Sequence, residues 1–386
     1  MAKKAGISVK KCQGRTGGTE YFMIVEAPAG LSYAEQLAAV ESRYEQARLD
    51  LGLDPQTAIF RRLFLSDTMN QAQLAQSSPL FSTAAAGPVA VSLVQQPPLP
   101  ESKIALLAYH IDSDAPVIKK RLSPKHLLIE KNNVKHLWST RLCAGAYGSA
   151  ASVVTQTGKI FGDLITTLGE HGGNLRDHCV RTWLYLKEVD VFYQGMVDRR
   201  TELFNQHGLT AETHYISSTG IQGACPHRYD LVSMDAYSIV DLAQNQMSFL
   251  NDFNYLCPTK DYNVTFERGT KIAFADRSHY YISGTASIDD VGRVMHPGNV
   301  LRQLDRTLEN IDALLRSGGA VLDDMMYFIV YLRDHADYSS IQQVLAERFP
   351  DLPTVIVLGP VCRPEWLIEI EGIAVRAVDE PALPAF

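Results

Sequence analysis

One cysteine and two carboxylates lie close together near the C-terminus, in a stretch with the pattern of a strand. Glu369 follows Cys362 by seven residues, and Glu371 follows two residues later. Alternate residues of a strand share a face, so Glu369 and Glu371 lie on one face, between Leu367 and Ile373. An unpaired buried carboxylate is costly, so such a group is ion-paired, protonated or used in chemistry. For Glu369 these explanations are open, whereas we expect Glu371 to pair with a nearby base.

Cys362 has two open explanations, a small apolar filler or a working thiol. The six cysteines of the chain show neither CxxC nor the spacing of a zinc site, so we expect reduced thiols in a cytoplasmic protein. The eleven histidines form no HxxxH or HExxH pair, and the Gly-Gly pairs do not belong to a phosphate loop. We therefore expect neither a metal site nor a cofactor.

The composition is that of a globular protein with more than one core. The chain has 386 residues, of which 46% are hydrophobic and 20% charged, and its net charge is −7. The excess of acidic over basic residues argues against a nucleic-acid partner, and no apolar run is long enough for a membrane span. The only basic run, Lys119-Lys120-Arg121, is interpreted as a solvated turn.

An internal repeat organises the chain. The apolar spacing between Leu301 and Leu315 predicts a helix that ends at Gly318-Gly319, and residues 325–334 follow as a strand. The same order recurs earlier, with a helical stripe over 160–168, then Gly172-Gly173, then a strand over 180–188.

A third copy lies at the N-terminus, where a helix over 33–51 ends at Gly52 and a strand over 58–67 follows. We therefore predict three tandem α+β units, each a sheet packed by helices, over residues 1–115, 130–245 and 255–378. Such a chain forms a pseudotrimer with ligand clefts at the unit boundaries, and it has little reason to trimerise further, so we expect a monomer.

The third unit resembles the Rid (YjgF-like) family of reactive-intermediate deaminases, which have a chorismate-mutase-like fold. The resemblance is carried by residues 281–286 (YISGTA), 310–315 (NIDALL), 330–334 (VYLRD) and 368–375 (IEIEGIAV). Members of this family are trimers with sites between subunits, which agrees with the tandem arrangement. The deaminases hold the substrate carboxylate with an arginine shortly after a proline. Thr354 occupies that place after Pro353 here, which argues against simple imine or enamine hydrolysis.

A second resemblance, over about residues 138–376, is to the chorismatases, a branch of the Rid family with fused domains. It is carried by residues 266–270 (FERGT), residues 217–221 (SSTGI) and the spacing from Cys362 to Glu369. Residues 1–115 depart from this pattern and keep a fuller first unit.

The resemblance implies a cofactor-free enzyme that cleaves the enolpyruvyl ether of chorismate and releases pyruvate. Carbon protonation at neutral pH needs a carboxylic acid with a raised pKa, and the resemblance assigns this role to Glu369. The dianionic substrate requires cationic and N–H donors. The candidates for this role are Arg268, Ser218, Thr219 and Gly220, with Arg141 and Arg181 as further carboxylate anchors.

Two positions bear on the product. The pattern of the dihydrodiol-forming branch has alanine where this chain has Gly269 and Cys362, and the 3-hydroxybenzoate-forming branch has glycine and cysteine. The implied products are therefore pyruvate and 3-hydroxybenzoate, with Cys362 assisting catalysis and Gly269 leaving room for the ring.

Two other functions stay open. One is a Rid-type imine or enamine deaminase, and the other is a non-catalytic pseudotrimer that binds a small molecule. From the residues alone, each arginine above is also an ordinary solvated side chain, Gly269 a bulge glycine, and residues 217–220 a plain loop.

Overall fold

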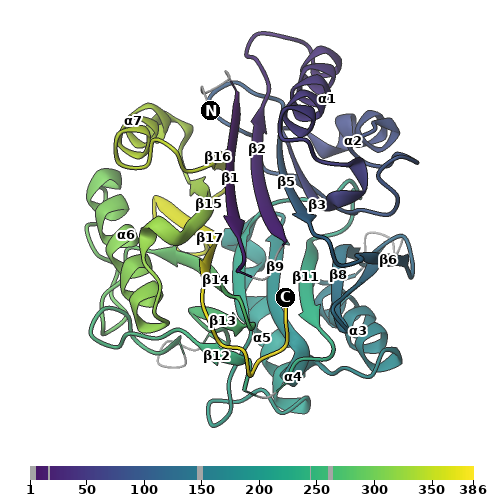
Figure 1. Cartoon of the computed structure of the whole chain (residues 1–386). Coiled ribbons are helices and arrows are strands. Elements are labelled where there is room, and N and C mark those ends of the chain that lie inside the picture. The colour runs from purple at the N-terminus through teal and green to yellow at the C-terminus, as the bar shows by residue number, and fades with distance from the viewer. Residues whose placement is uncertain (1–5, 16–17, 146–150, 244, 260–263) are drawn as a thin grey trace.

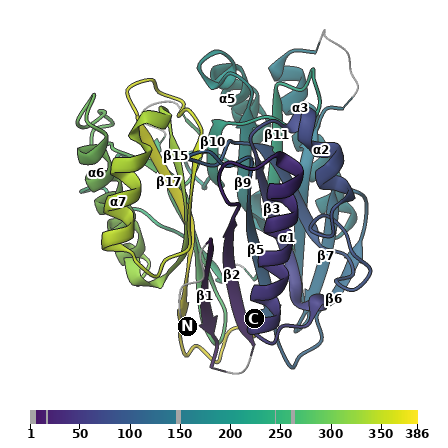
Figure 2. The same ribbon diagram turned by 90° about the horizontal axis from the view of Figure 1, so that it is seen from above.

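Three mixed β-sheets surround a common centre in the computed structural model, and helices cover their outer faces (Figures 1 and 2). The structure describes all residues except 1–5, 16–17, 146–150, 244 and 260–263. The first sheet has the order β1 (Ile7–Gln13), β2 (Thr19–Glu26), β5 (Ile104–Asp112), β3 (Ala58–Leu65), β4 (Ala90–Gln95). The second has the order β10 (Ser217–Gln222), β9 (Cys179–Leu186), β11 (Val232–Ile239), β8 (Val134–Cys143), β7 (His126–Lys131), β6 (Ile118–Arg121). The third has the order β12 (Met247–Phe249), β13 (Gly269–Ala273), β14 (Arg277–Ala286), β17 (Ile368–Ala377), β15 (Met325–Leu332), β16 (Thr354–Leu358).

Helices form at the three predicted places, near residues 33–51, 160–168 and 301–315, and at four others. They are α1 (Tyr33–Asp50), α2 (Thr68–Ser77), α3 (Val153–Glu170), α4 (Leu175–His178), α5 (Val189–Gln206), α6 (Val300–Ser317) and α7 (Tyr338–Arg348), with short 3-10 turns at Pro55–Thr57, Leu322–Asp324 and His335–Asp337. In α6, the Asn299 side chain caps the first turn, and Leu304, Leu308 and Ile311 face the sheet. Gly319 then takes a positive φ of 89°, which ends the helix.

The three units repeat one topology. Antiparallel strands, two in the first unit and three in each of the others, precede a helix, and two parallel strands joined by a second helix follow. The last strand then inserts antiparallel at the centre of its sheet. This arrangement confirms the predicted α+β fold of tandem Rid-like units.

Equivalent backbone hydrogen bonds close the ring of units. In each unit, the final residue of the outer parallel strand donates to the segment that precedes the last strand of the next unit. The bonds are Gln95 N to Ala224 O (2.8 Å), Gln222 N to Pro360 O (3.1 Å) and Leu358 N to Pro97 O (2.8 Å). The seam between the second and third units, at Gln222 and Pro360, borders the candidate site.

The inner faces of the sheets pack into a shared aromatic core. Trp138 lies 4.6 Å from both Phe60 and Tyr237, measured between ring centroids, and Phe22 contacts Tyr327. The inner faces of the three sheets are therefore buried against one another, and residues at the boundaries between the sheets line the clefts.

The interpretation of Lys119-Lys120-Arg121 as a turn is wrong. These residues form β6, an edge strand whose basic side chains bind the first unit: Lys119 Nζ donates to the carbonyls of Ala58 and Ala86, and Arg121 Nη2 donates to that of Val89. The second sheet therefore begins before the predicted boundary at residue 130. Within the described residues, no helix is both long and apolar enough to cross a membrane.

Candidate active site

A cavity of about 250 Å³ opens between the second and third sheets. Its walls come from α5, β10, β14, β17 and the segments before β13 and β17. The second sheet contributes Tyr193, Gln194, Arg200, Ser218, Thr219 and Gly220. The third contributes Val264, Phe266, Arg268, Gly284, Ala286, Ile288, Cys362, Arg363, Trp366 and Glu369. Six of the nine predicted site residues therefore meet here; Gly269, Arg141 and Arg181 do not line the cavity.

Glu369 lies on β17, with 5% of its surface exposed, and its side chain faces the cavity. Burial, and then the negative charge of Glu371, raise the pKa of this carboxyl group to about 8, against the weaker opposing effect of Arg181 and Arg268. Glu369 thus keeps its proton at neutral pH. A buried carboxyl group that holds a proton is equipped to act as a general acid.

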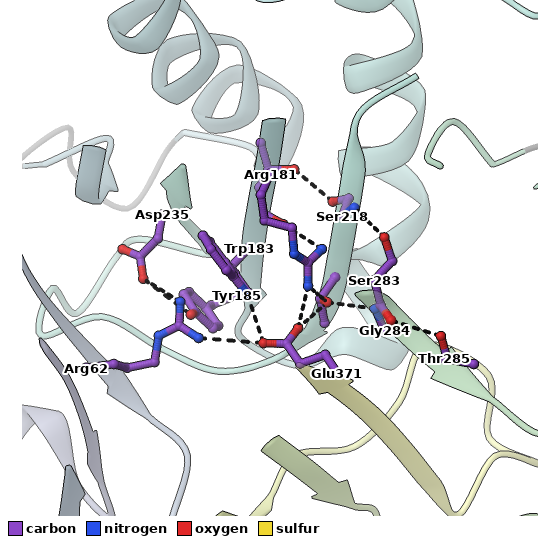
Figure 3. A network of polar contacts seen from close by, with 12 residues as sticks. Arg62, Arg181, Trp183, Tyr185, Ser218, Asp235, Ser283, Gly284, Thr285 and Glu371 are labelled. Carbon is purple, nitrogen blue, oxygen red and sulfur yellow. Dashed lines mark hydrogen bonds and ion pairs between the residues drawn. The ribbon is translucent and has the colours of Figure 1, made fainter. Parts of the chain in front are cut away.

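Glu371 lies two residues further on the same face and is fully paired (Figure 3). Arg181 Nη2 donates to Oε2 at 2.7 Å, Trp183 Nε1 donates to Oε1 at 2.8 Å, and the Thr219 hydroxyl also donates to Oε2. Arg62 Nη1 lies 3.6 Å from Oε1. The expectation that Glu371 pairs with a base is confirmed.

Gly284 makes room for the acid. The register between β14 and β17 shifts between Ile282 and Thr285, so Gly284 lies in a bulge beside the catalytic candidate. A Cβ atom at this position would clash with Oε1 of Glu369. The backbone N–H of Gly284 donates to the Thr219 hydroxyl at 2.9 Å, which ties the bulge to the Glu371 network.

The other charged side chains that line the cavity are arginines. Arg200, from α5, is 1% exposed; its Nε donates to Thr265 Oγ1 at 3.2 Å, while its buried Nη2 has no hydrogen-bond partner among the described residues. Arg268 is 4% exposed and lies 5.3 Å from the centre of the Phe266 ring. Arg363 also lines the wall. With Glu369 protonated, these guanidinium groups make the cavity positive and suited to an anionic ligand.

Cys362 borders the cavity from the segment before β17. Burial and the neighbouring Glu369 raise the pKa of its thiol to about 12, and Tyr193 and Arg363 oppose this shift. Cys362 is therefore a protonated thiol at neutral pH, which can donate a proton or accept a weak hydrogen bond but is a poor nucleophile.

Three predicted ligands are placed differently from the prediction. Gly269 lies on β13 beside Arg268, but a Cβ atom there would lie 2.8 Å from Leu250 Cδ1, so it faces the core. Arg181 is committed to Glu371, and Arg141 donates to the Pro124 carbonyl at 2.6 Å and lies over the Phe81 ring. The Thr219 hydroxyl, although at the wall, is likewise engaged with Glu371.

Sequence reasoning missed Arg200, Tyr193 and Gly284. Arg200 belongs to a polar helix in which it resembles a surface residue, and its burial arises only because α5 packs against the third unit. The glycine of the YISGTA motif was the one available signal for Gly284, since a glycine inside a strand indicates a bulge or a close approach.

The carboxyl group that lines the cavity occurs in only one of the three repeats. In the third unit, Glu369 lies opposite Tyr331, the penultimate residue of β15. The residues at the equivalent position are Ser233 in the second unit, opposite the penultimate residue of β9, and Ala105 in the first unit, opposite the penultimate residue of β3. The same comparison aligns Glu371 with Asp235, which is bound by Arg62 and Ser92. The buried ion pair is thus repeated in two units, but the acid is not.

Comparisons with known proteins agree with this architecture. The model of the family described as "Endoribonuclease L-PSP" matches residues 271–376. The 3-aminoacrylate deaminase RutC of Acinetobacter baylyi is 37% identical over 97 residues, which are 24% of this chain and 76% of that protein. A crystal structure of a chorismatase superposes with a TM-score of 0.64 and 17% identity, over 93% of this chain and 99% of that chain. The yeast protein Mmf1 matches 34% of this chain and 98% of its own, with 17% identity and a TM-score of 0.29.

Proposed function

Because the chain belongs to the Rid-related family of the endoribonuclease L-PSP type and has the fold of a chorismatase, we propose that it cleaves chorismate to pyruvate and 3-hydroxybenzoate. The observation that carries this proposal is Glu369, a buried carboxyl group whose pKa of about 8 keeps it protonated in a cavity lined by arginines. Enol ether cleavage requires both a carboxyl group that stays protonated at neutral pH and a site that binds the anionic substrate.

In the proposed reaction, Glu369 delivers its proton to the terminal CH2 carbon of the enolpyruvyl group. This step creates an oxocarbenium ion, and the breaking C–O bond transfers its electron pair to the oxygen that becomes the pyruvate carbonyl. The ring hydroxyl attacks the ring carbon that the pyruvate oxygen leaves, and the proton that it loses returns to Glu369. The bond from this oxygen to its original ring carbon then breaks, and that carbon loses its C–H proton while the oxygen gains one. The ring thus becomes aromatic, the acid is restored and no water is consumed overall.

The substrate carboxylates have donors in the same cavity. Arg200 and Arg268 are the proposed partners, since both are buried at the wall and Arg200 has an unused N–H group. Ser218 and Gly220 of β10 line the same cavity. Arg181 and Arg141 are left out because neither reaches the cavity.

A Rid-type deaminase is the weaker alternative. Thr354, which stands where the deaminases have arginine, pairs with Phe328 of β15. In the second unit Ser218 holds the equivalent position, since it pairs with Thr182 of β9. Ser218 is therefore the residue at this position that lines the cavity, and it too lacks the guanidinium group. The anchor of an imine acid's carboxylate is thus absent from both positions.

The direct test is the release of pyruvate from chorismate by the purified chain. Turnover by wild type that is abolished in Glu369→Gln, and kept in the exposed control Glu380→Gln, would support the proposal. Absence of pyruvate with wild type would exclude a chorismatase and leave the deaminase or the non-catalytic binding protein.

The product assignment depends on the resemblance and on Cys362. The double variant Cys362→Ala, Gly269→Ala is expected to shift the product from 3-hydroxybenzoate toward a dihydrodiol, which chromatography of the reaction separates. Since Gly269 faces Leu250, its part in this shift would come through displacement of β13 and Arg268. An unchanged product would reject the assignment.

A further inference from the structure

A second cluster of reactive side chains lies far in sequence from the cavity residues of β17 and does not line that cavity. Cys143 is the last residue of β8, and Cys225, His227 and Asp230 lie in the segment between β10 and β11. Among the described residues, one ligand atom each of Cys143, His227 and Asp230 lie within 4.8 Å of one another. Cys225 Sγ lies 3.8 Å from Asp230 Oδ2, and the thiols of Cys143 and Cys225 hydrogen-bond to each other.

We propose that Cys143, Cys225, His227 and Asp230 bind one zinc ion in a closed tetrahedral structural site. Zinc binds sulfur at about 2.3 Å and nitrogen or oxygen at about 2.0–2.2 Å, so tetrahedral ligands lie roughly 3.3–3.8 Å apart. In the structure the ligand atoms of Cys143, His227 and Asp230 lie within 4.8 Å of one another, and Cys225 Sγ joins them at 3.8 Å from Asp230 Oδ2, so the four side chains must rotate inward to reach these separations. Two thiolates, an imidazole and a carboxylate favour zinc over magnesium or calcium.

The electrostatic surroundings fit this ligand set. With two thiolates, one carboxylate and a neutral imidazole, the loaded site has a net charge of −1. Lys125 Nζ lies 3.3 Å from the Cys143 carbonyl, and Lys159 Nζ lies 2.6 Å from that of Ala144, so two ammonium groups approach the site. Each thiol releases its proton to solvent when the metal binds, and no oxidant or reductant is needed.

The site would stabilise the seam between the first and second units. The segment that carries three of the ligands also carries Ala224, whose carbonyl accepts the hydrogen bond from Gln95 of β4. The same segment leads into β11, which holds Asp235. Cys143, Cys225 and Asp230 are buried and His227 is exposed, so an ion can enter from the His227 side. This inference is independent of the proposed chorismatase activity.

The test uses the full chain, purified with reductant, stripped of metal and titrated with Co²⁺ and then Zn²⁺ against a chelator. We expect one equivalent to bind, with the thiolate-to-cobalt charge-transfer band and the intense visible bands of a tetrahedral site. His227→Gln should weaken binding more than about tenfold, because even changes outside the ligand set cost 10–100-fold. His335→Gln, at another exposed histidine, should bind as wild type does.

Cys225→Ser provides the second variant and should abolish the charge-transfer band, whereas Cys179→Ser should keep it. Octahedral cobalt spectra without a thiolate band, or equal affinity in wild type and Cys225→Ser, would overturn the proposal. So would reduced wild type that binds no metal but forms a Cys143–Cys225 disulfide on oxidation.

Discussion

Glu369 and Glu371 lie on the same face of β17, and Glu371 is bound by Arg181 and approached by Arg62 (Figure 3). The network of Arg62, Arg181, Trp183 and Thr219 binds Glu371, while burial and then the negative charge of Glu371 raise the pKa of Glu369. A structural ion pair thus tunes a neighbouring acid, which is a recurring way to obtain acid chemistry at neutral pH.

Glu371→Gln should therefore move the pH dependence of the reaction. The active form of Glu369 is protonated, so wild-type kcat/KM should fall as the pH rises through about 8. Removal of the Glu371 charge lowers the pKa of Glu369, and the fall should begin at a lower pH. The variant should also lose roughly 3–5 kcal/mol of stability because buried arginines lose their partner. Pyruvate release against pH measures the shift, and an unchanged profile would show that Glu371 does not tune the acid.

Glu369 should destabilise the folded chain as the pH rises. Its pKa is raised from 4.5 to about 8 in the folded state, so between these values the folded state holds a proton that the unfolded state has lost. The free energy of unfolding therefore falls by about 1.4 kcal/mol per pH unit from this group. Glu369→Gln should match wild type near pH 4 and exceed it by a few kcal/mol near pH 8. Denaturant unfolding at several pH values tests this, and a difference independent of pH would contradict the raised pKa.

Gly284→Ala should impair catalysis more than stability. The added Cβ atom meets the Glu369 carboxyl group, which must then move away from its present place in the cavity. Since a displacement of about 1 Å can cost about 100-fold in rate, we expect a loss of that order in kcat. Gly162→Ala in α3 is the matched control, because its Cβ meets no atom within 4 Å. Equal kcat values for both variants would contradict the role of Gly284.

Arg200→Met should weaken substrate binding while it preserves the fold. Methionine keeps much of the volume and removes the buried cation, while Thr265, which loses the Arg200 donor, keeps Thr201 as a hydrogen-bond partner. Loss of a charged hydrogen bond costs about 1.5–3 kcal/mol, so KM should rise roughly 10–150-fold, with a smaller effect on kcat. Arg316→Met, at a largely exposed arginine, is the control. An unchanged KM would mean that the unpartnered Nη2 of Arg200 does not bind the substrate.

The repeat and the strand faces were predictable because they depend on local periodicity. The apolar stripe from Leu301 to Leu315 and the alternation of residues around Glu369 can be recognised from the local sequence alone, and both are confirmed, in α6 and β17 respectively. The edge strand β6 was missed because its charged residues show no apolar alternation, and its stability comes from contacts with another unit.

The composition of the site was less predictable, because it depends on which units meet. Nothing local distinguishes the buried Arg200 from a solvated arginine, or places Arg181 against Glu371 rather than in the cavity. The approach of Cys143 to Cys225 was likewise hidden, since Cys143 ends β8 and Cys225 lies in the segment between β10 and β11, which the second sheet brings together.

Carbon protonation by Glu369 is tested most directly by chorismate turnover in D2O, with the released pyruvate followed by NMR. The acid exchanges its proton with solvent, so wild type should release pyruvate with one deuterium in its methyl group, and Glu369→Gln should release none above background. Pyruvate without methyl deuterium, or deuterated pyruvate formed by Glu369→Gln at the wild-type rate, would contradict the role of Glu369.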